Sequence, residues 1–258
     1  MIQVNHETGK ITRLGITLRA YVYEVDGLLI DTGPKSAFFQ LRSFFQKSKI
    51  NQIALTHIHE DHSGNAGWWW KKKQISSFIH KDSVPLAEKK GIYPFYRRMY
   101  WGQRKPFKAL PIPEVIETDN FQFQVIETPG HSADSISLFE KENGWIFTGD
   151  LFITEKPQLF LREESIPETI NSLKKLLELD IGTLFCAHSG KINNGKKRLQ
   201  NKLDYLLEFQ GQVLELHQKG MSKQEIVKEL FPKNSPMIFF SSGEFSYIRG
   251  VESIINND

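Results

Sequence analysis

The pattern of apolar and polar residues divides the chain into short apolar runs followed, toward its end, by longer stretches with helical spacing. Short apolar runs bounded by turn residues predict strands. Several runs end in an Asp or a His beside a glycine or a turn, and strand ends are where sheets present polar residues for function. These run-ending residues are Asp31 after GLLI, His57 after IALT, His131 after FQVIETPG, Asp150 after WIFTG, and His188 after TLFCA.

The connections between the runs predict hairpins and a packing helix. Asp-Gly at positions 26–27 and Asn-Gly at 143–144 are typical of tight turns, so we expect much of the sheet to be antiparallel. Ser165, followed by a proline, a glutamate and leucines on one face, predicts a helix that packs on a sheet and stops near Gly182.

The end of the chain changes to a helical pattern. Leucines recur at helical spacing from about Gly195, and Gly220 supplies a stop. Ser222 then opens a capping box for a shorter helix that ends before Pro232. We therefore expect a main domain at residues 1–194 and a small helical extension at residues 195–258.

The segment at residues 84–113 lies between two strand-like runs and is expected to be an irregular insertion. As a lid, its aromatic side chains would cover an apolar acyl group and its arginines would hold an anionic end. The alternatives are a homodimer interface and ordinary packing. Its aromatic and basic residues include Tyr93, Phe95, Tyr96, Tyr100, Trp101, Phe107, Arg97, Arg98, Arg104 and Lys105.

The composition is that of a folded protein and limits the partners. The chain has 258 residues, of which 40% are hydrophobic and 24% charged, and its net charge of +3 does not demand nucleic acid or an acidic membrane. Cys186 is the single cysteine, which excludes an internal disulfide or a multi-cysteine zinc site and favours a reducing compartment. Since we find neither a signal peptide nor a membrane-spanning segment, we expect a cytoplasmic protein.

The strongest chemical signal is the string at residues 56–62, THIHEDH, with three imidazoles and an aspartate in an H-x-H-x-D-H pattern. Following a strand, the alternate residues His57 and His59 can point the same way and chelate one metal ion. Asp61 and His62, at the start of the next helix, can turn toward a second ion. The alternative, a histidine-rich loop without metal, is disfavoured by three imidazoles this close together.

Three isolated residues extend this set. His131 and His188 each follow an apolar run, where a lone histidine is more often structural. Their strand-end placement, shared with the H-x-H-x-D-H string, favours metal ligation instead. Asp150 could cap a helix, but a carboxylate there can also bridge two cations with its two oxygens.

Two competing motifs are weaker. Asp31-Thr32-Gly33 matches the aspartic protease signature, but that chemistry needs a second aspartate of the same kind, which the chain lacks. The sequence at 130–134, GHSAD, approaches a nucleophile elbow but ends in Asp134 where glycine is needed.

The motifs taken together, in this order and spacing, closely resemble those of the metallo-β-lactamase superfamily over roughly residues 10–192. The resemblance implies an α/β fold, a four-layer αββα sandwich whose two mixed sheets face each other, with a metal cleft at one edge. It implies that Asp31 orients a ligand histidine without touching metal. The implied ligands are His57, His59 and His131 for one ion, Asp61, His62 and His188 for the other, and Asp150 as the bridge.

For such a site the resemblance implies a dinuclear metallo-hydrolase. Two zinc ions, or else iron or manganese, would share a water molecule and present a hydroxide, with Asp61 placed to handle a proton. We expect hydrolysis of a small-molecule ester, thioester or lactone. The alternative is a metal-dependent endoribonuclease or phosphodiesterase, whose nucleic-acid contacts would be Lys196-Lys197-Arg198 and the lysines at 71–73.

The resemblance also narrows the range of possible activities and substrates. Asp150 stands where the commonest zinc β-lactamases carry cysteine, and His59 stands where the diiron oxygen-reducing branch carries glutamate. Ile153 replaces the tyrosine of quorum-quenching lactonases, and the residues after Asp150 do not continue as in glyoxalase II enzymes. Hydrolysis is therefore favoured over redox chemistry, and the acyl substrate stays open.

Overall fold

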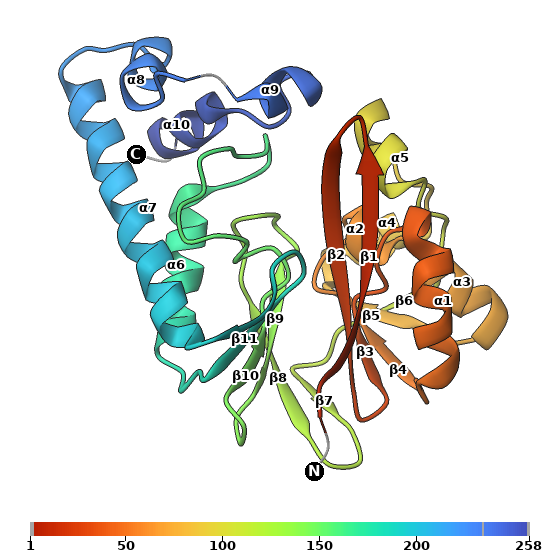
Figure 1. The fold of residues 1–258 in the computed structure, drawn as a ribbon. Coiled ribbons are helices and arrows are strands. Elements are labelled where there is room, and N and C mark those ends of the chain that lie inside the picture. Colours follow the sequence, from red (N-terminus) through yellow and green to blue (C-terminus); the bar gives the residue numbers. More distant parts are fainter. Residues whose placement is uncertain (1–2, 234, 257–258) are drawn as a thin grey trace.

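The computed structural model describes residues 3–233 and 235–256 and places two six-stranded sheets face to face (Figure 1). Both sheets are mixed, since β3 to β6 are parallel, β10 and β11 are parallel, and the other neighbours are antiparallel. The first sheet has the order β1 (Asn5–Arg13), β2 (Ile16–Val25), β3 (Leu28–Ile30), β4 (Gln52–Ala54), β5 (Ser77–Ile79) and β6 (Ala109–Pro111). The second has the order β12 (Gly190–Asn193), β11 (Thr183–Cys186), β10 (Trp145–Phe147), β9 (Ile136–Glu140), β8 (Gln122–Glu127) and β7 (Val115–Glu117).

Helices cover the outer face of each sheet, which confirms the predicted four-layer α/β sandwich with C-terminal helices. The first sheet is covered by α1 (Phe38–Lys47) and α3 (Ala66–Lys73), and the second by α6 (Ile166–Leu177) and α7 (Gly195–Gln218) (Figure 1). The shorter helices are α2 (Glu60–Ser63), α4 (Val84–Ala87), α5 (Phe95–Trp101), α8 (Lys223–Leu230), α9 (Pro236–Phe240) and α10 (Tyr247–Ile255). Two 3-10 turns, η1 (Lys35–Ala37) and η2 (Lys81–Ser83), complete the order.

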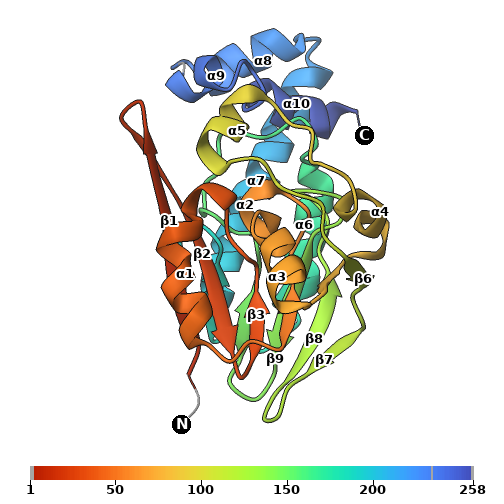
Figure 2. The ribbon, with the colours of Figure 1, turned by 90° about the vertical axis from the view of Figure 1, so that its right-hand side faces the viewer.

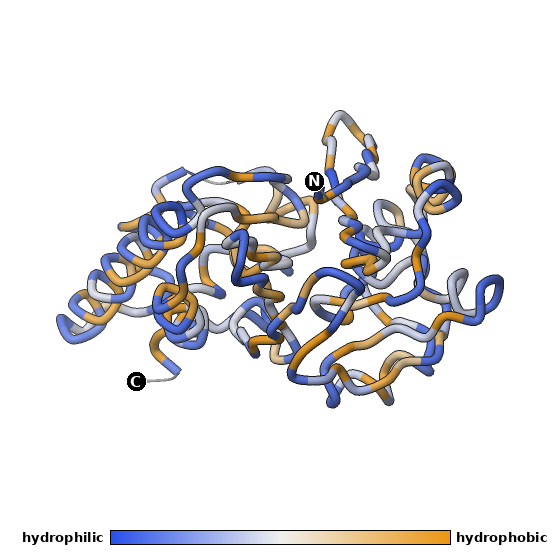
Figure 3. The backbone as a smooth tube through the Cα atoms, turned by 90° about the horizontal axis from the view of Figure 1, so that it is seen from below, coloured by the Kyte–Doolittle hydropathy of each residue, from blue (hydrophilic) through white to orange (hydrophobic). Residues whose placement is uncertain are grey.

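Three apolar cores hold the four layers together. The first lies between the first sheet and its helices, the second between the two sheets, and the third between the second sheet and its helices. In β3, Leu28 and Ile30 face the opposite sheet while Leu29 packs toward α1, because successive strand residues point to opposite faces. In the third core, Leu173 of α6 and Leu203 of α7 are buried. Figure 3 shows apolar and polar stretches alternating along α7, as expected of a helix with one buried face.

The strands that carry the run-ending polar residues point the same way within each sheet. In the first sheet β3 and β4 are parallel, and in the second β8, β10 and β11 share one direction because β9 is antiparallel to both β8 and β10. The polar residues that follow these strands therefore collect at one edge of each sheet.

The C-terminal helices lie across this edge. Figure 2 shows α8, α9 and α10 above the sheets, next to α5. The rings of Tyr96 in α5 and Phe240 in α9 lie 5.6 Å apart between centroids, so the two segments are in contact. Among the residues that the structure describes, no helix is long and apolar enough to cross a membrane.

The predicted helix starts are found, but two boundaries differ. Ser165 and Ser222 accept hydrogen bonds from the backbones of α6 and α8, and Ser222 forms the predicted capping box. The predicted stop near Gly182 is wrong: α6 ends at Leu177, and the Gly182 N–H pairs with the Gly144 carbonyl at the entry to β11. The segment at 84–113 is not wholly irregular either, because it contains α4 and α5 and its end forms β6, the edge strand of the first sheet.

Candidate metal centre

The H-x-H-x-D-H string leaves the end of β4 and turns into α2. His59 is the N-cap of α2, and the helix that follows turns Asp61 and His62 back toward His57. The ring centroids of His57 lie 4.0 Å from His62 and 4.5 Å from His59. Asp134 fixes the turn, because its carboxylate accepts a hydrogen bond of 2.8 Å from the Ile58 N–H.

The second sheet supplies the other three residues. His131 follows β8, Asp150 follows β10 and His188 follows β11. Asp150 is brought close to the string by Gly149, whose φ is +50° and where a Cβ atom would lie only 2.6 Å from the Thr56 hydroxyl. A glycine is required there, both for its conformation and for the close approach of the two loops.

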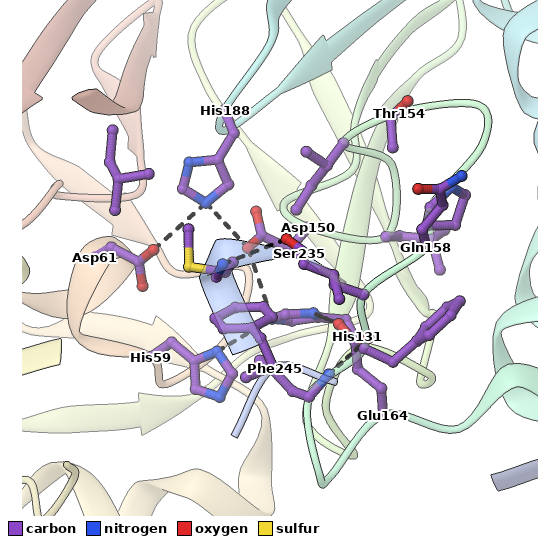
Figure 4. Close-up of a pocket in the computed structure, with 18 of the residues that line it drawn as sticks. His59, Asp61, His131, Asp150, Thr154, Gln158, Glu164, His188, Ser235 and Phe245 are labelled. Carbon is purple, nitrogen blue, oxygen red and sulfur yellow. Dashed lines mark hydrogen bonds and ion pairs between the residues drawn. The ribbon is translucent and has the colours of Figure 1, made fainter. Parts of the chain in front are cut away.

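All seven predicted ligands come together between the two sheets. Figure 4 shows those that line the adjoining cavity, His59, Asp61, His131, Asp150 and His188. The seven form two groups in which the candidate ligand atoms lie within 4.8 Å of one another. Asp150 lies between the groups, with Oδ2 3.1 Å from His188 Nε2 and 3.6 Å from His131 Nε2. The first group is His57, His59 and His131, and the second is Asp61, His62, Asp150 and His188.

Carboxylates outside the two groups orient the histidines. Asp31, which the resemblance implied as an orienting residue, lies 2.7 Å from His62 Nδ1 through its Oδ2 atom. Two further partners were not foreseen: Glu164 lies 2.6 Å from His131 Nδ1, and Glu163 lies 3.3 Å from His59 Nε2. A carboxylate on one ring nitrogen fixes the proton there and leaves the other nitrogen free to bind a metal ion. The free atom is Nε2 in His62 and His131, and Nδ1 in His59.

The donor set fits divalent metal ions. His57 Nε2, His62 Nε2 and Asp150 Oδ1 are buried without a hydrogen-bond partner among the described residues. The last two atoms lie 3.4 Å apart without forming a hydrogen bond. Buried polar atoms of this kind are costly unless a ligand satisfies them, and imidazole nitrogens with carboxylate oxygens suit zinc, iron or manganese. The arrangement is compatible with two metal ions.

The pKa values of the candidate ligand histidines are shifted in opposite directions by their surroundings. Burial and the neighbouring imidazoles lower the pKa of His57 well below its ordinary value. Burial acts in the same direction on His62, but Asp31 and Asp150 outweigh it and raise the pKa of His62 well above the ordinary value. The pKa of His188 is likewise raised, against burial, by Asp150 and Asp61. Burial also acts to lower the pKa of His131, but its hydrogen bond with Glu164 and the charge of Asp150 outweigh burial and raise it.

A cavity of about 600 Å³ opens directly beside the two groups. Five of the seven candidate ligands line it, and most of the rest of its wall is apolar. This apolar wall comes from α5, from the loop after β10 and from the C-terminal segment. It includes Tyr96, Tyr100, Trp101, Leu151, Ile153, Leu159, Phe160, Met237, Phe240 and Phe245.

Comparison with known proteins identifies the family. Residues 20–188 match the family model described as "Metallo-beta-lactamase superfamily". The chain belongs to the metallo-β-lactamase superfamily. It is a metallo-hydrolase of that superfamily, and the matched range includes all seven candidate ligands and Asp31.

Within the superfamily, similar proteins include enzymes and solved structures. A metallo-β-lactamase family protein of Thermus thermophilus superposes with a TM-score of 0.71 at 18% identity, over 98% of this chain and 93% of the other. The probable metallo-hydrolase YybB of Bacillus subtilis is 28% identical over 64% of this chain and 76% of its own length. An atrochrysone carboxyl ACP thioesterase of Aspergillus fumigatus is 25% identical over 72% of this chain and 55% of its own length.

Two arginines of residues 84–113 are already paired within the protein. The guanidinium of Arg97 forms a paired contact with Glu60, at 2.6 and 2.8 Å, and a further contact of 3.2 Å with Glu244. Arg104 is buried and donates to the backbone carbonyls of Leu86 and Ala87. The internal partners of Arg97 and Arg104 therefore do not support the expectation that the arginines of this segment hold an anionic end of the substrate, which stays a prediction.

A buried lysine that the sequence reasoning overlooked lines the cavity instead. Lys202 of α7 is 6% exposed, and its Nζ atom donates to the Leu151 carbonyl at 2.5 Å. Within the leucine-rich pattern of α7 it is a lysine on the apolar face, one turn before Leu206. That break in the helical pattern was the available signal.

Proposed function

We propose that the chain hydrolyses an ester or thioester whose acyl chain lies in the cavity beside the metal centre. The observation that carries the proposal is the position of the apolar wall, which begins at the candidate ligands and is closed by Tyr96 and Phe240. An apolar cavity with a few polar groups at one end suits an apolar ligand with one reactive polar group. The thioesterase among the relatives supports the same class of substrate.

The seven ligands would hold two metal ions, for which we expect zinc, with iron or manganese as the alternatives. When bound, such ions supply an activated water molecule and polarise the substrate's carbonyl oxygen. The chain's own residues hold the geometry: Asp31 and Glu164 fix the rings of His62 and His131. Asp61 lines the cavity with its carboxylate ionised, since His62 and His188 hold its pKa low against the effect of burial. It would therefore serve as a metal ligand and as a hydrogen-bond acceptor that orients the attacking water, more readily than as a strong base.

The nuclease alternative has less support from the positions of the basic residues. Arg198 is paired with Glu155 at 2.6 Å, and Lys196 donates to the Leu179 carbonyl. The lysines at 71–73 end α3, where cations favour the helix terminus, and none of these basic residues lines the cavity. A backbone-tracking groove would need a row of exposed cations leading to the reactive end of the cleft, whereas among the described residues Arg19 and Lys156 are the exposed lysine and arginine side chains that line the cavity.

Truncating the apolar wall should change the preference for chain length. We expect Phe240→Ala to weaken binding of a long-chain acyl thioester by about 1–3 kcal/mol, since a buried aromatic contact is lost. Activity on the acetyl thioester should be preserved, because a short acyl group does not reach Phe240. The measurement is kcat/KM for a thioester series of increasing chain length, with metal-replete protein.

The neighbouring residue provides a matched control. Phe239 is 92% exposed and does not line the cavity, so Phe239→Ala should leave the whole series unchanged. Salt-dependent cleavage of single-stranded RNA together with no thioester hydrolysis would overturn the proposal in favour of the nuclease.

A further inference from the structure

Lys202 is a buried cation without a carboxylate partner. It is 6% exposed, and no carboxylate oxygen lies within 4.0 Å of its Nζ atom among the residues that the structure describes. Its single hydrogen-bond acceptor in that part of the chain is the Leu151 carbonyl. An ammonium group has three N–H donors, so two of them are left without a protein acceptor. Lysine is rarely buried in this way unless a partner compensates it.

The surroundings of Lys202 place this charge in the substrate cavity. Lys202 and Leu206 line the cavity from α7, and Ile166 lines it from α6. Leu151, whose carbonyl holds the ammonium, directly follows the candidate metal ligand Asp150. The cation therefore lies in the wall of the cavity between apolar side chains and the loop that follows Asp150, close to the reactive end.

The other cations of the cavity are differently placed. Arg97 is paired with Glu60 and Glu244, and Arg19 and Lys156 are exposed. Burial lowers the pKa of Lys202 to about 8, while Glu164, Cys186 and Asp150 act in the opposite direction. At neutral pH most of the Lys202 side chains are therefore still charged and able to bind an anion.

We propose that Lys202 binds a second carboxylate of the acyl group, a short chain away from the reacting carbonyl, so that the preferred substrates are monothioesters or monoesters of short dicarboxylic acids. This inference rests on the proposed acyl hydrolysis and adds the chemical class of the acyl group. A carboxylate would accept hydrogen bonds from the two free N–H donors of Lys202. The methylene groups between this carboxylate and the reacting carbonyl would contact the apolar wall. The residue is specificity-determining and takes no part in bond cleavage.

The test compares two thioester series of equal chain length, one ending in a methyl group and one in a carboxylate, from succinyl upward. For at least one length, metal-replete wild-type protein should prefer the carboxylate-ended thioester. Lys202→Gln can still donate to the Leu151 carbonyl but has no charge, and we expect it to lose about 10- to 100-fold of this preference, mainly through KM. Lys202→Met removes both the charge and the hydrogen bond.

The two variants separate specificity from a structural role. If Lys202 only supports the loop after Asp150, Lys202→Gln will behave like wild type, or both series will lose activity equally, and the proposal is overturned. A preference that is lost in Lys202→Gln, with activity on methyl-ended thioesters retained, supports it.

Binding of the free acids keeps this test independent of catalysis. The dicarboxylate of the preferred length should raise the unfolding temperature of wild-type protein more than the matching monocarboxylate, and Lys202→Gln should abolish the difference. If no thioester is hydrolysed but this difference is present, the proposed function fails and the anion site stands. If neither series nor the free acids reveal a carboxylate preference, the Lys202 proposal is wrong.

Discussion

At the scale of single residues, Asp31 combines an unusual backbone conformation with a side chain that orients a ligand histidine. Its φ is +59°, in the left-handed region that aspartate tolerates better than most residues. Its carboxylate accepts hydrogen bonds from the Thr56 N–H at 2.8 Å and the Thr56 hydroxyl at 2.9 Å, and it holds His62. The charge that fixes the His62 ring is also the main reason that its pKa is raised.

The raised pKa values predict how metal uptake depends on pH. In the metal-free protein, His62 and His188 are protonated at neutral pH, and a metal ion must displace these protons. Affinity of the second group should therefore rise as pH increases toward these raised pKa values. The rise should be steeper than for the first group, where the pKa of His131 is raised but that of His57 is lowered. Zinc titrations at about pH 6 and about pH 8, with proton release measured, check this.

The effect of Asp31 on metal binding can be tested against a second aspartate with a similar backbone conformation, Asp26. We expect Asp31→Asn to flatten this pH dependence and to weaken metal binding by about 10- to 100-fold, because the partner of a ligand histidine is lost. Asp26 also has a positive φ, of +51°, but lies in the turn after β2, so Asp26→Asn should leave metal binding unchanged. Equal pH dependence in wild type and Asp31→Asn would contradict the explanation.

At the scale of elements, Arg97 joins three segments that are distant in sequence. It belongs to α5, and its partners are Glu60 of α2 and Glu244 in the segment between α9 and α10. Glu60 is 2% exposed, so its charge depends on Arg97 for compensation. The same contact positions α2, from which Asp61 and His62 reach the metal centre.

Removing this arginine should be costly. We expect Arg97→Met to lower the free energy of unfolding by about 3–5 kcal/mol, because Glu60 is left as a buried and uncompensated charge. Urea unfolding of the metal-free protein gives the value. Glu244→Gln keeps an oxygen acceptor for Arg97 and leaves the contact between Arg97 and Glu60 in place, so it should cost clearly less than Arg97→Met. Similar losses in the two variants would show that Glu60 does not depend on Arg97.

The elements also show which features could be predicted from neighbouring residues in the sequence and which could not. Hairpin turns, capping serines and strand-ending polar residues are short-range patterns, and each predicted an element or a ligand that lies where expected. Arg97 and Glu60 are separated by 37 residues, and Arg97 and Glu244 by 147, so no local pattern pairs them. For this reason the sequence alone predicts that the arginines at 84–113 are free for a ligand, and it does not show that Lys202 faces the cavity.

At the scale of the whole molecule, the metal centre joins the two sheets. His57, His59, Asp61 and His62 follow a strand of the first sheet, whereas His131, Asp150 and His188 follow strands of the second. An ion bound by both sets can form its full coordination only when the sheets are assembled. Metal binding should therefore stabilise the folded state relative to the unfolded chain.

Chelation should therefore lower stability. We expect removal of metal to decrease the free energy of unfolding by about 4 kcal/mol when the metal had been present at roughly a thousand times its dissociation constant. The measurement is the unfolding temperature with and without a chelator. His131→Ala, which removes a ligand from the second sheet, should reduce this difference, whereas His217→Ala, an exposed site on α7, should not. An unfolding temperature that does not respond to the chelator would contradict a metal-linked assembly.

The order of these parts along the chain affects how the protein matures during synthesis. Every candidate ligand lies at or before His188, whereas Met237, Phe240 and Phe245, which close the cavity, come last from the ribosome. Because folding during synthesis tends to proceed from the N-terminal side, the ligand cluster can assemble before its cover exists. A nascent chain would then acquire its ions through an open cleft, and the finished protein would exchange them through the narrower cavity. Its metal content would therefore depend largely on which metal ions were available while it was being synthesised.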